Sequence, residues 1–271
     1  IEQLIFKKDL SKYNAKSKEI GRASRIDDAQ GRYIEFAKNS IQNCSLKGLK
    51  VVIDCANGAC YKVSPMIFRE LGADLIILNN EPDGLNINKE SGALHPKITK
   101  SAVLGQEADV GISVDGDGDR VILTDETGKI LDGDHILAIA GLYFKEKGKL
   151  NKNTIVVTKY TNLGFDKLME KHGINIVRVK NGDRYVIEEM KRNNYNLGGE
   201  QSGHIIFSDN NSTGDGTISA LQILKIMKKT GKKLSELSSK LTKYPQVLVN
   251  VEVKEKIPIK NLPSVSAKIK E

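Results

Sequence analysis

The first half of the chain alternates short runs of β-branched residues with amphipathic stretches that end at Gly or Pro. Strands are predicted at residues 49–54, 73–78 and 110–114. A helix is expected over Ser64–Leu71, because Pro65 suits a first helical turn and Gly72 can end the helix. Residues 121–124 and 129–131 flank a turn and therefore predict a β-hairpin.

The same order of elements begins again near residue 154. Strands are predicted at 154–157, 174–179 and 204–207, with another leading into Gly198–Gly199, and helices at 163–171, 185–192 and 217–229. Asp215 precedes the last of these helices and is a candidate N-cap. The repeated order suggests two α/β domains of similar construction, with a boundary near residues 132–137. In such sheets, ligands bind at the loops beyond the carboxyl ends of the strands.

The two ends of the chain have no predicted core of their own. The first residues resemble the tail of a helix followed by a polar connector, and they show no signal-peptide pattern and no initiating Met. Residues 244–271 are rich in Lys and Pro and are predicted to be strand-like. We interpret both ends as connectors.

Composition narrows the class of protein. The chain has 271 residues, of which 39% are hydrophobic and 28% charged, enough apolar material for packed cores. No apolar run approaches the roughly 18 residues of a membrane span. Cys44, Cys55 and Cys60 form no paired pattern and indicate a reducing cytoplasm. The net charge is +8, but the Lys residues are scattered and aromatics are only 5%, which disfavours nucleic acid as a partner.

The densest chemical signal is an acidic loop that directly follows a predicted strand. Asp115, Asp117 and Asp119 alternate with two glycines. Carboxylates at this spacing can converge on one point, and they repel one another unless a cation is bound. Their oxygen atoms favour Mg²⁺ or Ca²⁺. A solvated acidic turn is the alternative without a ligand.

The spacing also matches part of a calcium-binding EF-hand loop. The three Asp residues match positions one, three and five, and Glu126 matches position twelve. Position six needs Gly for its turn, however, and Arg120 stands there. The flanks are also predicted strands rather than helices. The pattern therefore favours Mg²⁺ with a phosphate oxygen as a further ligand, and so phosphoryl chemistry. Arg120 could neutralise the transferring group or form a salt bridge with its own loop.

A second polar cluster lies between glycines at residues 198–204. Glu200 and Ser202 are two residues apart, so an extended segment points them the same way, which suits adjacent sugar hydroxyls. His204 could donate to a phosphate or shuttle a proton. Arg184 could contact a phosphate or face solvent. A Gly-rich turn with a surface His is the structural alternative.

Together these segments resemble the α-D-phosphohexomutase superfamily over nearly the whole chain. The resemblance is carried by residues 21–36, 54–59, 82–88, 115–120, 182–186 and 199–204. Gln201 resembles the residue found at this position in the branch of the family that acts on glucosamine phosphates. Met is typical there in the branch that acts on mannose and glucose phosphates. Lys159–Asn162 departs from the Ser-Asn stretch that is usual before the following helix.

The resemblance implies an α/β fold with two similar αβα domains of phosphohexomutase type, each built on a mixed sheet. It divides the chain into the tail of a first domain with a connector at 1–27, a second domain with the metal-binding loop at 28–133, a third domain with the sugar-binding loop at 134–243, and a connector toward a fourth domain at 244–271. The nucleophilic serine loop of the family's first domain and the phosphate loop of its fourth domain are absent from this sequence. Those two domains are therefore expected partners, while the oligomeric state is not predicted.

The activity implied by the resemblance is the cytoplasmic interconversion of glucosamine 6-phosphate and glucosamine 1-phosphate, through a bisphosphate and an enzyme phosphoserine, for cell-wall precursors. By the same resemblance, Asp115, Asp117 and Asp119 would bind Mg²⁺, Arg120 and His204 would be catalytic, and Glu200, Ser202 and Arg184 would bind the phosphorylated amino sugar. The chain alone is expected to bind Mg²⁺ weakly and to show no turnover. The alternatives are a phosphomannomutase or phosphoglucomutase, and a non-catalytic metal-binding module.

Overall fold

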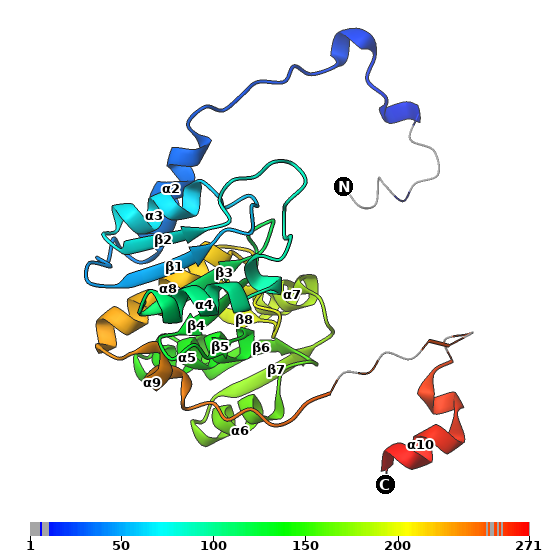
Figure 1. Ribbon diagram of the computed structural model, residues 1–271. Helices are drawn as coiled ribbons and strands as arrows, with labels where there is room; N and C mark the ends of the chain where they lie inside the picture. The colour runs from blue at the N-terminus through cyan, green and yellow to red at the C-terminus, as the bar shows by residue number, and fades with distance from the viewer. Residues whose placement is uncertain are drawn as a thin grey trace.

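The computed structural model describes Phe6 and residues 11–247, 249, 252–253, 255 and 257–270. Within these residues the chain forms two mixed β-sheets with helices on their faces, which confirms the predicted α/β class (Figure 1). The predicted tail of a first domain at residues 1–10 lies, apart from Phe6, outside the described residues. In the described part of the chain, no helix has the length and apolar character that a membrane crossing requires.

The first sheet has the strand order β2-β1-β3-β4-β5. Its strands are β1 (Lys50–Asp54), β2 (Asp74–Leu78), β3 (Val110–Val114), β4 (Val121–Asp125) and β5 (Ile130–Leu131). β1 runs parallel to β2 and β3, and β4 is antiparallel to both of its neighbours. The predicted hairpin is therefore confirmed. Residues 115–120, the acidic loop, connect β3 to β4 at the edge where the parallel strands end.

The second sheet repeats this plan with the order β7-β6-β8-β9. Its strands are β6 (Thr154–Thr158), β7 (Asn175–Val179), β8 (Leu197–Gly199) and β9 (Ile205–Phe207). Three parallel strands are again followed by one antiparallel strand. Residues 200–204, the polar loop, connect β8 to β9 and so occupy the position that the acidic loop has in the first sheet.

The helices cover the faces of both sheets. They are α2 (Ala29–Ser40), α3 (Val63–Glu70), α4 (Lys97–Gly105), α5 (Gly133–Glu146), α6 (Leu163–Lys171), α7 (Asp183–Asn193), α8 (Gly216–Thr230), α9 (Leu234–Ser238) and α10 (Pro263–Lys270), with 3₁₀ turns at Ser11–Tyr13, Ser17–Glu19, Gly92–Leu94, Asn151–Asn153 and Ile259–Asn261. α4 covers one face of the first sheet and α7 one face of the second. α5 and α8 lie between the sheets and contact strands of both.

The alternation of side chains along the central strands explains these layers. Val51 and Ile53 of β1 face the main core, whereas Val52 between them packs on the side of α4. In β6, Ile155 and Val157 face the main core and Val156 packs beside α7. Both sheets thus bury one face in the same cluster of apolar side chains.

That shared core joins the two predicted domains. α5 is buried continuously from Gly133 to Gly141, and α8 from Gly216 to Leu224, as expected of helices enclosed on several sides. α8 belongs to the second predicted domain but packs on β3 and β4 of the first. Its buried Gln222 also donates to Ser40 of α2. The division of the chain near residue 133 stays a prediction.

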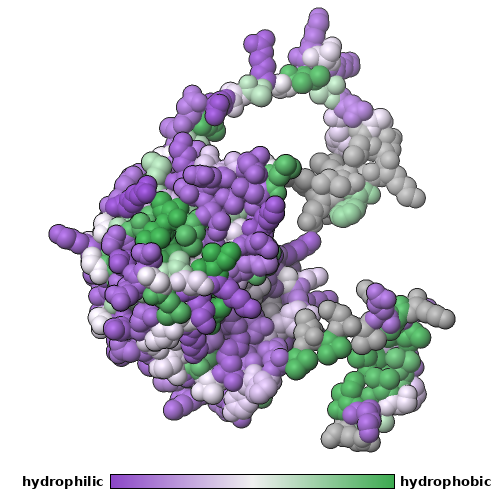
Figure 2. All heavy atoms as spheres, in the orientation of Figure 1, coloured by the Kyte–Doolittle hydropathy of each residue, from purple (hydrophilic) through white to green (hydrophobic). Residues whose placement is uncertain are grey.

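The structure departs from the sequence-based expectations in its helices. α2, α5 and α9 were not predicted. Residues 263–270, expected to be strand-like, form α10 instead, because Pro263 suits the first helical position and Val265 and Ile269 have the four-residue spacing of a helix. Both apolar side chains are exposed, and Figure 2 shows apolar surface on this C-terminal segment, apart from the body of the molecule.

A substitution at the start of α5 tests how tightly this helix packs against the polar loop of the second sheet. A Cβ at Gly133 would lie 1.9 Å from the carbonyl oxygen of Glu200. We expect Gly133→Ala to lower the free energy of unfolding by about 1–3 kcal/mol, the usual cost of overpacking. Gly31→Ala in the exposed part of α2, where nothing lies within 4 Å, is the control and should be neutral or stabilising by up to about 1 kcal/mol. Urea denaturation measures both, and equal stabilities would contradict the tight junction.

Candidate functional site

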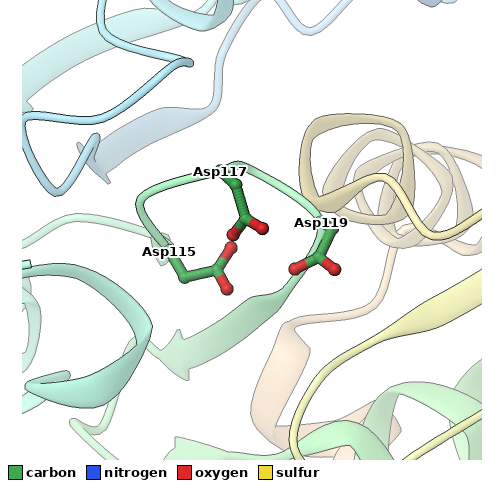
Figure 3. Close-up of side chains that lie close together, drawn as sticks. All are labelled: Asp115, Asp117 and Asp119. Carbon is green, nitrogen blue, oxygen red and sulfur yellow. The ribbon is translucent and has the colours of Figure 1, made fainter. Parts of the chain in front are cut away.

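The acidic loop brings its three carboxylates together. One oxygen from each of Asp115, Asp117 and Asp119 lies within 4.8 Å of the others, and Figure 3 shows the three side chains directed toward a common space. Gly118, at φ +78°, provides the left-handed residue that the tight turn requires. Asp115 is buried, Asp117 is exposed and Asp119 is intermediate. The predicted convergence is therefore present in the fold.

The positive charge near the acidic loop does not neutralise its three carboxylates. Burial, and then the charges of Asp119 and Asp117, raise the pKa of Asp115 to about 6, although the backbone N–H of Arg120 acts in the opposite direction. The Arg120 Nε atom lies 3.6 Å from Asp115 Oδ2 and 3.7 Å from Asp119 Oδ1. Asp119 Oδ1 is buried and accepts no hydrogen bond from the described residues. Three oxygens with a free buried acceptor fit a hard divalent cation such as Mg²⁺.

Arg120 belongs to the acidic loop and contacts the polar loop. Its backbone forms an antiparallel bridge with His204, and the next amide, Val121 N–H, donates to Gly203 O at 3.1 Å. Its side chain is partly exposed and lines a cavity of about 870 Å³. Both sequence-based readings of this residue are thus compatible with its position, since the guanidinium lies near its own carboxylates and also faces the cavity.

The ring of His204 is buried next to Asp119 of the acidic loop. Only 2% of the residue is exposed, its Nδ1 atom lies 3.1 Å from Asp119 Oδ2, and a Cβ on Gly214 would touch its ring. Its Nε2 atom is buried without a hydrogen-bond partner among the described residues. The geometry favours support of Asp119, in the way that residues behind a metal ligand hold it in place. The predicted proton-shuttle role of His204 stays a prediction.

Glu200 and Ser202 lie together, as their spacing predicts. Both line the 870 Å³ cavity, and Ser202 Oγ donates to Glu200 Oε2 at 3.5 Å. Glu200 Oε1 accepts from the backbone N–H of Gly182 at 2.9 Å, which fixes the carboxylate against the loop before α7. The pair presents one acceptor-rich and one donor–acceptor group to the cavity, a combination suited to neighbouring hydroxyls.

Arg184 is not among the residues that line this cavity. Its Nε atom donates to Glu188 one turn further along α7 at 2.8 Å, and both side chains are largely exposed. Asn181, from the same loop, lines the cavity instead. The predicted contact of Arg184 with a phosphate stays a prediction.

The cavity also has walls that the sequence analysis did not identify. They come from the end of β6, the start of α5 and the segment after α9: Thr158, Tyr160, Asn162, Asp132, Lys243, Tyr244, Gln246 and Val247. The residues after β6 could have been found, because the carboxyl ends of parallel strands are where ligands bind in such sheets. Nothing in the sequence around Lys243 predicted that this segment returns to the cavity.

Comparison with known proteins identifies two matching domain families. "Phosphoglucomutase/phosphomannomutase, alpha/beta/alpha domain II" matches residues 31–128, and domain III of the same family matches residues 132–244. A curated relative from Geobacter metallireducens, named phosphoglucosamine mutase, is 51% identical over 271 residues, which are 100% of this chain and 60% of the relative. One of the same name from Bdellovibrio bacteriovorus is 51% identical over 97% of this chain and 58% of its own length.

Solved structures show the same fold. A putative phosphomannomutase from Thermus thermophilus has a TM-score of 0.70 and 22% identity, covering 81% of this chain and 51% of its own. The N-acetylphosphoglucosamine mutase of Aspergillus fumigatus in complex with GlcNAc-6P and magnesium has a TM-score of 0.66 and 24% identity, covering 83% of this chain and 56% of its own. The chain thus spans about 60% of the length of the curated relatives and about half of these structures.

The acidic loop predicts that metal binding depends on Asp117. We expect calorimetric titration to show Mg²⁺ binding to the wild-type chain, and Asp117→Ala to weaken it by more than the roughly 10- to 100-fold that loss of an outer partner costs. Glu146→Gln, an exposed carboxylate on α5 paired with Lys147, is the control and should bind as the wild type does. Equal affinity of Asp117→Ala and the wild type would contradict a metal site in this loop.

Proposed function

Because this chain belongs to the phosphoglucomutase/phosphomannomutase family, we propose that it forms the metal-binding and sugar-binding part of a phosphoglucosamine mutase. The reaction would interconvert glucosamine 6-phosphate and glucosamine 1-phosphate. The relatives that share about half of its residues carry this name. The observation that carries the proposal is the direct backbone junction of the acidic loop with the polar loop, which places Arg120, Glu200 and Ser202 around one cavity.

Each loop has a separate part in this proposal. Asp115, Asp117 and Asp119 would hold Mg²⁺, which when bound would neutralise charge on a phosphate group. Arg120 would add a fixed positive charge at the cavity side of the same loop. Glu200 and Ser202 would hold the sugar through its hydroxyls and so orient it toward the acidic loop. His204 would keep Asp119 in place through the contact of its Nδ1 atom with Asp119 Oδ2.

The phosphoryl donor expected from the family resemblance, a serine in another domain, has no counterpart in these 271 residues. We therefore propose that the chain alone shows no mutase turnover, and that the flanking domains of the family complete the site. The chain spans 60% of the Geobacter metallireducens relative, which offers those domains for a direct test.

The activity is tested by a chimera in which this chain replaces the matching part of that relative. We expect the folded chimera to convert glucosamine 6-phosphate with a higher kcat/KM than glucose or mannose 6-phosphate, and the isolated chain to show no turnover. The unmodified relative and the chimera carrying Asp117→Ala are the controls. Preference for glucose or mannose phosphates would move the assignment to phosphoglucomutase or phosphomannomutase. A folded chimera that binds ligands without turnover would indicate a binding module.

Glu200 is expected to contribute to kcat/KM by binding the sugar. In the active chimera we expect Glu200→Gln to lower kcat/KM for glucosamine 6-phosphate by about 10- to 100-fold, because a hydrogen bond to a charged group is worth about 1.5–3 kcal/mol. The amide oxygen of Gln can still accept from Gly182, so the loop should keep its shape. Glu146→Gln changes an exposed carboxylate of α5, serves as the control and should leave the kinetics unchanged. Unchanged kinetics in Glu200→Gln would remove Glu200 from the binding site.

A further inference from the structure

Residues 242–247 follow α9 and form one wall of the 870 Å³ cavity. We call them the exit segment. Lys243, Tyr244, Gln246 and Val247 line the cavity, and Figure 1 shows the chain running from α9 past α6 before it leaves the body of the molecule. The exit segment contains no helix or strand in the described structure. Hydrogen bonds and ion pairs with the elements beside it hold it in place.

Asn162 holds the exit segment from the side of α6. Its Oδ1 atom accepts from the backbone N–H of Tyr244 at 2.9 Å, and its Nδ2 atom donates to the carbonyl of Tyr244 at 2.8 Å. The side-chain amide thus pairs with one residue of backbone as a neighbouring strand would. Gly164 allows the approach, since a Cβ there would lie 1.9 Å from Thr242 O. Asn162 is 2% exposed, so this contact is a buried one.

Gln201 reaches the same segment from the polar loop. Its Nε2 atom donates to Asp134 Oδ2 at 2.9 Å and lies 3.4 Å from Gln246 Oε1. Gln246 in turn accepts from Asn162 Nδ2 at 3.1 Å and donates to Tyr160 O at 2.9 Å. One carboxamide therefore connects the loop that carries Glu200 with the exit segment.

The connection through Asp134 depends on each hydrogen-bond donor that reaches this carboxylate. The residue is fully buried, and its Oδ2 atom also accepts from Asn162 N–H at 3.1 Å and lies 3.3 Å from Lys243 Nζ. Its Oδ1 atom has no hydrogen-bond partner among the described residues. A buried carboxylate depends on every donor that reaches it, because an unmet acceptor keeps its full desolvation cost. An apolar residue at position 201 would remove one donor from Asp134 and one from Gln246.

We propose that Gln201 is a positioning residue that ties the polar loop to the exit segment through Asp134 and Gln246, and so fixes the cavity wall that faces Glu200 and Ser202. The Nε2 group of Gln201 is occupied by these two contacts. The identity of that ligand rests on the proposed function, but the tie itself is a property of the protein without metal or sugar.

Hydrogen exchange measured by mass spectrometry on the 271-residue chain tests the tie. We expect Gln201→Met to speed exchange in a peptide covering 241–247 by about tenfold, since the N–H of Tyr244 is bonded there, with peptides of α8 unchanged. Gln106→Met makes the same chemical change at an exposed position beyond α4 and should alter neither peptide. Gln246→Met removes the other end of the tie from the surface and should reproduce the local effect if Gln201→Met fails to fold.

A double-mutant cycle separates positioning through Asp134 from a general loss of packing. If Gln201 acts through the buried carboxylate, Gln201→Met should change exchange at 241–247 by less than about twofold in an Asp134→Asn background. Additive effects of the two substitutions, or unchanged exchange in both Gln201→Met and Gln246→Met, would overturn the proposal. Neither measurement uses Mg²⁺ or a sugar phosphate, so an inactive chimera would leave this result standing, and failure here would leave the mutase assignment untouched.

Discussion

The arrangement of the site depends on a close backbone junction between the acidic loop and the polar loop. Gly133, Gly203 and Gly216 lie at this junction, and a Cβ on each would come within 1.9, 2.3 and 2.5 Å of a backbone carbonyl oxygen. Gly203, at φ +98°, also adopts a conformation that other residues rarely take. Hydrogen bonds from Val121 N–H to Gly203 O and from Gly216 N–H to Gly118 O close the contact. The distance between the carboxylate cluster and Glu200 is therefore set by main chain rather than by flexible side chains.

The shared core keeps this junction in register. Two sheets of the same plan present equivalent loops, but equivalent loops meet only if the sheets are held at a fixed orientation. α5 and α8 provide that orientation because each packs on strands of both sheets within one apolar cluster. α5 begins at the polar loop, where Gly133 N–H donates to Gln201 O, and α8 begins at the acidic loop, where Gly216 N–H donates to Gly118 O. The helices that form the core are thus also the helices whose first residues fix the site.

The sequence predicted what depends on local pattern and missed what depends on the meeting of distant segments. The strands of both sheets, the hairpin after the acidic loop and the convergence of three Asp residues follow from alternation and spacing, and the structure contains them. The helices at 29–40 and 133–146 were not predicted, although an Asp, a favoured N-cap residue, precedes each of them. The side chain of Asp132 does cap α5, whereas that of Asp28 makes no capping hydrogen bond. The contact between His204 and Asp119 joins residues 85 positions apart, and the return of Lys243 to Asp132 joins residues 111 apart. No pattern within either segment contains that information.

The balance of charge in the cavity explains why this part of the chain would need help to bind a phosphate. Its charged lining residues are Arg120, Lys243, Asp132 and Glu200, two cations against two carboxylates. Lys243 is already engaged by Asp132 and Asp134, which leaves Arg120 as the cation of this lining with freedom to face a ligand. Arg120 in turn lies near Asp115 and Asp119, and burial together with the charges of Asp119 and Asp117 raises the pKa of Asp115 to about 6. A phosphate dianion placed here would meet a lining without net positive charge, so the compensating charge has to come from a divalent cation on the acidic loop or from groups beyond these residues. A carboxylate cluster that is costly in isolation becomes the means of recruiting that charge.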